Sequence, residues 1–165
     1  MHKLTREIKK ELLKRLIDEN IERTNTCIKL LGKKDIHFRP NENCNSVAML
    51  IQHINGNIRQ WLISPLTNKK FKRKRKQEFI ENKNISKEDL LSITEELRND
   101  IINTVDYINE EYLIREFTIQ GFHTSGYGIV NHVTEHFSYH CGQITLLTKM
   151  ILNTDTAYYA GIQLE

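Results

Sequence analysis

Apolar residues recur at steps of three and four positions through most of this 165-residue chain, with charged residues between them. That spacing places the apolar side chains on one face of a helix and is typical of amphipathic helices packed around a core. The chain has only two prolines, Pro40 and Pro65, and each stands where an apolar run stops. They are expected to separate helices and not to kink them. The pattern therefore predicts an all-α protein.

Four runs are long enough to be the main helices. Ser46 is a good N-cap for the second run, and Ser86 followed by two acidic residues is a typical helix start for the third. A four-helix bundle is the expected architecture, with a long crossover connection, residues 63–86, between the second and third helices. The expected helices cover about residues 3–31, 46 to just before Pro65, 86–108 and 125–152, in one domain of residues 1–165.

Residues 110–125 do not share this helical spacing. They contain Gly121 and a short alternating stretch, residues 113–119, that can be extended, but the chain shows no convincing sheet. Gly142 lies inside the last predicted helix, where glycine lowers helix propensity. Close approach of a neighbouring helix is the expected reason for it, and close approach of a ligand is the alternative.

The cysteines and the hydropathy limit the class of protein. Cys27, Cys44 and Cys141 are odd in number and contain no CxxC pair, which argues against a disulfide framework and a thiolate zinc site. No signal-peptide pattern and no run of about 18 apolar residues occurs. We expect a cytoplasmic protein with no membrane span, in which Cys141 is a small core or interface residue.

The net charge of +3 comes mostly from one basic run, residues 69–76. This run holds one aromatic residue, Phe71, and no recognition helix accompanies it. A solvated crossover loop is the preferred interpretation. Nucleic-acid binding through residues 69–76 is the alternative, and steep weakening by salt would reveal it.

The last predicted helix carries the clearest chemical signal. On a helical wheel, His136 and His140 share the inward sector with Val133 and Ile144. Side chains spaced i and i+4 lie about 6 Å apart, close enough to bind one metal ion. The alternative is that both imidazoles are core residues that hydrogen-bond tyrosines or backbone groups. His132 lies at the edge of the sector and suits a second-shell or surface role.

A third metal ligand has to come from another helix, and His53 is the only histidine of the second predicted helix. Its wheel position alone does not decide its role. No Asp or Glu lies on the inward sector of the last helix, so the sequence names no general base.

Two segments resemble the DinB/YfiT-like superfamily of metalloproteins. Residues 135–144, EHFSYHCGQI, are similar to its EHxxYHxGQI signature, and residues 46–61 are similar to its second helix. The resemblance implies that His53, His136 and His140 bind one divalent metal ion, with the remaining coordination positions left to water. It also implies a homodimer.

The resemblance leaves the metal and the reaction open. Zinc and nickel are expected first, and iron and manganese also suit three imidazoles. Some relatives are transferases that use low-molecular-weight thiols such as bacillithiol. A metal-dependent thiol S-transferase or a hydrolase acting on a small-molecule substrate is thus expected, and metal binding or partner binding without turnover is the alternative.

Overall fold

The computed structural model describes residues 3–163. Its first long helix runs without a break through α1 (Lys3–Leu13), a π-helical segment η1 (Lys14–Ile21) and α2 (Glu22–Leu30). Leu12, Leu16, Ile21 and Ile28 line its buried face. The predicted helix over residues 3–31 is confirmed to within one residue.

The second long helix combines α3 (Val47–Ile58), a π-helical segment η3 (Arg59–Ile63) and α4 (Ser64–Thr67), after a short 3₁₀ turn η2 (Asp35–His37). Ser46 caps α3 by accepting a hydrogen bond from the Met49 amide. The prediction that this helix ends before Pro65 was wrong, because Pro65 lies in the first turn of α4. Pro65 has no N–H to donate to the preceding turn, and the long helix ends soon after it, at Asn68, which has a positive φ.

A crossover of residues 68–86, which includes the short helix α5 (Arg75–Glu78), leads to α6 (Lys87–Val105). Ser86 and Asp89 form a reciprocal capping box at the start of α6. Both the crossover connection and the predicted start of the third helix are confirmed.

Residues 110–125 form α7 (Glu110–Ile114) and a two-stranded antiparallel hairpin of β1 (Glu116–Ile119) and β2 (Phe122–Ser125). Gln120 and Gly121 both have positive φ and make the tight turn in which Ile119 pairs with Phe122. The expectation of no sheet was therefore wrong for this short segment. Ser125 then caps α8 (Gly126–Leu152), close to the predicted boundaries.

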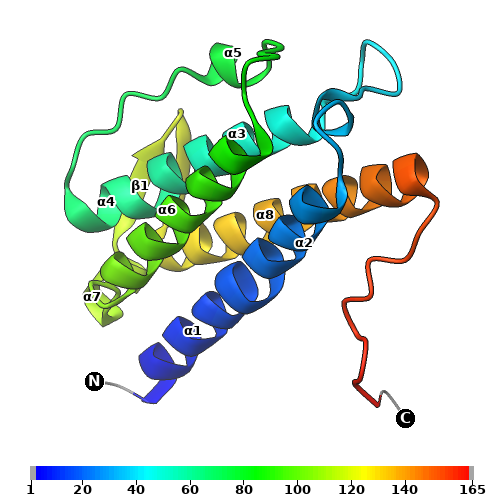
Figure 1. Ribbon diagram of the computed structural model, residues 1–165. Helices are drawn as coiled ribbons and strands as arrows, with labels where there is room; N and C mark the ends of the chain where they lie inside the picture. The colour runs from blue at the N-terminus through cyan, green and yellow to red at the C-terminus, as the bar shows by residue number, and fades with distance from the viewer. Residues whose placement is uncertain (1–2, 164–165) are drawn as a thin grey trace.

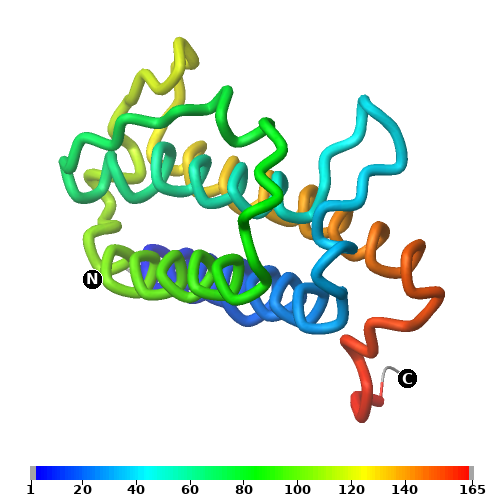
Figure 2. Tube along the Cα trace, turned by 45° about the horizontal axis from the view of Figure 1, so that its top comes forward, coloured from blue at the N-terminus to red at the C-terminus, as the bar shows by residue number. Residues whose placement is uncertain are grey.

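The long helices pack side by side as a bundle (Figures 1 and 2). α8 packs against both α2 and α3, and α6 closes the bundle by packing against α3 and α2. The core between them includes Leu97, Ile101, Val133 and Phe137, all almost fully buried. The all-α four-helix bundle is confirmed. Of the predicted domain of residues 1–165, positions 1, 2, 164 and 165 lie outside the described residues.

Gly142 corrects one expectation about packing. It is exposed, and a Cβ atom built on it would meet no described atom within 4 Å. Close approach of a neighbouring helix is therefore not the reason for this glycine. Among residues 3–163, no helix has both the length and the hydropathy that crossing a membrane requires.

Candidate metal centre

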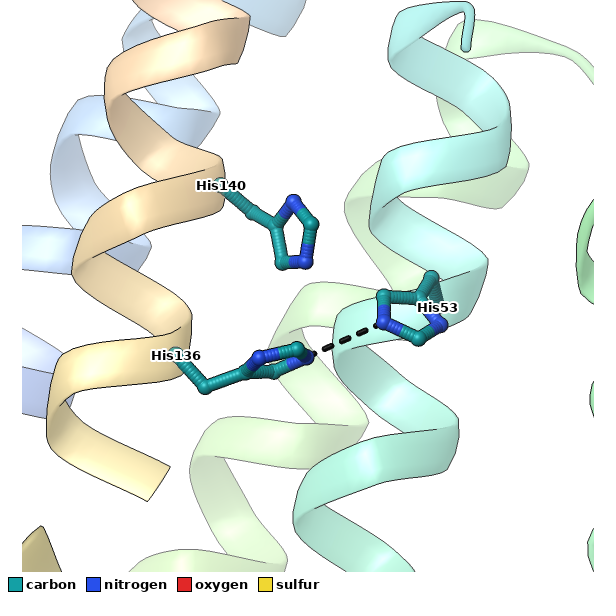
Figure 3. A group of neighbouring side chains, drawn as sticks. All are labelled: His53, His136 and His140. Carbon is teal, nitrogen blue, oxygen red and sulfur yellow. Dashed lines mark hydrogen bonds between the residues drawn. The ribbon is translucent and has the colours of Figure 1, made fainter. Parts of the chain in front are cut away.

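The packing of α3 against α8 brings three histidines together (Figure 3). His53 comes from α3, and His136 and His140 come from successive turns of α8. The ligand atoms of the three rings all lie within 4.8 Å of one another, and the Nε2 atoms of His53 and His136 are 3.0 Å apart. His53 and His140 are buried and His136 is partly buried. The two histidines of α8 therefore face the bundle, as the helical wheel predicted.

Hydrogen bonds orient two of the three rings. The Nδ1 atom of His53 lies 2.9 Å from Glu78 Oε2, and the Nδ1 atom of His140 lies 2.7 Å from Gln143 Oε1. Both partners are acceptors. The Nη2 atom of Arg73 also lies 3.1 Å from His53 Nδ1, but the contact to the carboxylate is shorter, so we place the proton of each ring on Nδ1, from which it is donated. The Nε2 atoms of His53 and His140 consequently keep lone pairs, which is the state that a metal ligand needs.

The spacing of the cluster fits a divalent ion. Two imidazole nitrogens bound to one zinc ion, each about 2.0–2.1 Å from it, can be at most about 4.2 Å apart. In a tetrahedral site they lie about 3.4 Å apart, so the 3.0 Å between the Nε2 atoms of His53 and His136 fits, whereas a pair as far apart as 4.8 Å has to approach by about 1.4 Å when the ion binds. The Nε2 atoms of His53 and His136 share one hydrogen bond, and a metal ion could instead accept lone pairs from all three rings. The donor set and its packing thus suit a metal ion.

The surroundings keep His136 and His140 neutral. Burial lowers the pKa of His136 to about 3, and the neighbouring His140, His53 and His132 and the charge of Arg73 add to the effect. Burial also lowers the pKa of His140, against a hydrogen bond to Gln143 that raises it. Neutral imidazoles are the form that binds metals, so the site favours the ligand state near neutral pH.

Lowering the pH is expected to destabilise the metal-free protein already at pH values above those at which Asp and Glu side chains titrate. The pKa of His136 is about 3 in the folded chain and 6.5 in the unfolded one. The unfolded chain therefore binds the extra proton between these values, and stability falls as pH drops below about 6.5. Because His136 is only partly buried, we expect a loss on the order of 1 kcal/mol between about pH 7.5 and about pH 5.

Urea unfolding of chelator-treated protein at the two pH values measures this loss. The H136Q variant should show a weaker pH dependence of stability, because the His136 ring no longer titrates. Part of the dependence should remain, because burial also lowers the pKa values of His132 and His140. Equal stability of the wild type at both pH values would contradict the prediction.

Two residues at the site were missed by the sequence reasoning. Glu78 ends α5 and touches His53, and Arg73 contacts the same carboxylate with Nε at 2.6 Å and Nη2 at 2.7 Å. Burial would raise the pKa of Glu78, but hydrogen bonds from His53 and Arg73 and the charge of Arg73 outweigh it and hold the pKa below its usual value. Glu78 is therefore an ionised carboxylate.

Arg73 belongs to the basic run of residues 69–76, which was expected to be solvated. Its side chain is only 3% exposed, whereas the other basic side chains of the run are exposed. The solvated-loop interpretation was thus wrong for Arg73. Gly56 is the sequence feature that could have revealed this contact. It lies within α3, and a glycine inside a helix often marks the close approach of another group. A Cβ atom at Gly56 would overlap Glu78 and lie 3.0 Å from Arg73 Nε.

Other aromatic and polar residues extend the site along the two helices. The His132 ring lies tilted against Trp61, with 4.1 Å between centroids, and stacks on His136 at 5.3 Å. His132 thus supports the His136 ring, in agreement with a role outside the ligand set. Cys141 packs in the core near Asn20, also as expected.

The fold and the three-histidine cluster together define a DinB-like helical bundle with a candidate metal centre. Residues 6–160 match the family described as "Protein of unknown function (DUF1572)", and the chain belongs to that family. Its fold is similar to the crystal structure of a DinB-like protein, YjoA, from Bacillus subtilis, with a TM-score of 0.69 and 17% sequence identity. That match covers 90% of this chain and 96% of the other. No curated protein matches the chain. The fold that the resemblance implied, that of a DinB-like protein, is confirmed.

Proposed function

We propose that this protein binds one divalent metal ion through His53, His136 and His140. The observation that carries the proposal is the cluster itself, in which three imidazoles from two helices have ligand atoms within 4.8 Å of one another. The orientation of two rings by Glu78 and Gln143 supports it, because metal-binding histidines usually donate their second N–H to such acceptors.

Zinc and nickel are the ions we expect first, with iron and manganese as further candidates, since three imidazoles suit all four. When bound, such an ion supplies open coordination positions at which a water or a thiol loses its proton more readily. On this basis we propose a metal-dependent enzyme acting on a small molecule, either an S-transferase that uses a low-molecular-weight thiol or a hydrolase. The family resemblance supports the thiol reaction.

The roles of the protein side chains follow from their contacts. The three histidines hold the ion, and the hydrogen bonds to Glu78 and Gln143 fix two of the rings. Glu78 is not available as a general base, because both of its oxygens accept hydrogen bonds from Arg73. A proton from the substrate therefore has to leave by way of a bound water or thiol.

The other candidate functions have less support. Metal binding without turnover is compatible with the same cluster. Nucleic-acid binding through residues 69–76 would rely on the exposed lysines of the run, and Arg73 is not available to it, because its side chain is buried against Glu78. A homodimer and a cytoplasmic location stay predictions.

Metal content tests the proposal directly. We expect protein purified without a metal-binding tag to carry one divalent ion per chain by elemental mass spectrometry. H53A, H136A and H140A should each lose it, while H123A, which changes an exposed histidine of β2, should keep it. A wild type that neither carries metal nor takes up added zinc or nickel would overturn the proposal.

A further inference from the structure

The first part of the crossover, residues 68–79, lies against α3 beside the candidate metal centre. α5 packs on α3, the Phe79 ring lies 4.8 Å from the His53 ring, and Ser64 of α4 donates a hydrogen bond to the Lys69 carbonyl. We call residues 68–79 the basic segment. The segment therefore contacts a predicted metal ligand directly.

Arg73 and Glu78 attach the basic segment at this place. Their side chains are 3% and 10% exposed, and Arg73 also donates to the His53 carbonyl and to Gln60 Oε1, both at 3.3 Å. A buried ion pair of this kind is strongly disfavoured when one partner is removed, because the other charge is left without a partner. Arg73 and Glu78 thus depend on each other for their positions.

The pair contacts His53 at the ring and at the backbone, since Glu78 Oε2 and Arg73 Nη2 both lie near Nδ1 and Arg73 also donates to the carbonyl. The Glu78 carboxylate accepts from Nδ1 of His53, which fixes the ring orientation and leaves the lone pair on Nε2, the atom that faces His136. A carboxylate in this position also makes the imidazole a stronger electron donor to a metal ion. The packing of the basic segment against α3 and the orientation of His53 for metal binding are therefore linked through the contacts of Glu78 and Arg73 with His53.

We propose that Glu78 and Arg73 are a positioning pair for His53. Through this pair, metal binding and the packing of the basic segment against α3 stabilise each other. This inference rests on the proposed metal binding. Coupling of this kind is reciprocal. The factor by which packing of the segment raises the metal affinity equals the factor by which bound metal raises the equilibrium constant for packing of the segment. Metal binding would thereby control whether the segment that carries the exposed lysines is held against α3.

Zinc affinity and hydrogen exchange of the same variants test the proposal. Zinc affinity is measured by competition with a chromogenic chelator for the wild type, E78Q, E78D and E81Q. E81Q is the matched control, because it removes the same charge from the same crossover at a residue whose ion-pair partner is Lys83. We expect E78Q to bind zinc about 10- to 100-fold more weakly, E78D to recover part of the loss, and E81Q to equal the wild type.

Hydrogen exchange supplies a readout that a purely structural role would not move. Zinc should slow amide exchange across residues 68–79 in the wild type and in E81Q, and should do so much less in E78Q. If E78Q does not fold, R73K serves in its place, since lysine keeps the charge but cannot make the two contacts to Glu78.

The outcomes separate this inference from the proposed function. Zinc binding by the wild type with equal affinity in E78Q, or unchanged exchange of residues 68–79, overturns the positioning pair and leaves the metal site standing. Failure of the wild type to bind zinc overturns both.

Discussion

Saturation with zinc is expected to raise the free energy of unfolding by about 4 kcal/mol when free zinc exceeds its dissociation constant about 1,000-fold. A ligand stabilises a protein to the extent that it binds the folded chain and not the unfolded one. His53 and His136 are 83 residues apart in the chain, and the packing of α3 on α8 is what brings them within 3.0 Å. The unfolded chain has no such site, so nearly all of the binding free energy adds to stability.

Urea unfolding with and without zinc measures this effect. The H140A variant should gain far less stability from zinc than the wild type, because it keeps only two of the three ligands. The H123A variant should gain as much as the wild type, and a chelator should remove the gain in both. An equal gain in H140A and the wild type would show that zinc binds elsewhere, and no gain in the wild type would contradict the metal site.

Replacement of Gly56 by alanine is expected to damage the candidate metal centre. The added Cβ would overlap Glu78 Oε1 and press on Arg73 Nε at 3.0 Å. Glu78 cannot simply rotate away, because its carboxylate is buried and bonded to both Arg73 and His53. We expect G56A to weaken zinc binding about tenfold or more, since the carboxylate that orients His53 is displaced.

The stability of G56A follows from two opposed effects. Overpacking costs about 1–3 kcal/mol, and the higher helix propensity of alanine returns up to about 1 kcal/mol. A net loss of about 1–2 kcal/mol in the free energy of unfolding is therefore expected, measured by urea unfolding without metal.

Gly142 offers the matched control for this substitution. It also lies inside a long helix, but a Cβ there meets no described atom within 4 Å. We expect G142A to be neutral or stabilising by up to about 1 kcal/mol and to leave zinc affinity unchanged. If G56A and G142A behave alike, the close approach of Glu78 to α3 has no energetic consequence and the account of the site is wrong.

The four long helices and the inward face of His136 and His140 could be predicted from the sequence alone. Apolar periodicity placed the helix over residues 3–31 and the last helix over residues 125–152, and the wheel turned His136 and His140 inward. These features follow from local geometry, because the repeat of a helix and its end signals depend on residues only a few positions apart.

The tertiary structure decided which groups from distant parts of the chain meet. Glu78 is 25 residues from His53, in a crossover without periodicity, and no local rule brings the two together. Gly56 and Gly142 look alike in the sequence, yet only Gly56 lies under another segment. The hairpin at residues 116–125 and the helical turn through Pro65 likewise depend on their surroundings. The reason is physical, since contacts between segments depend on how helices pack and where the chain crosses between them, and side-chain spacing along one helix does not encode that.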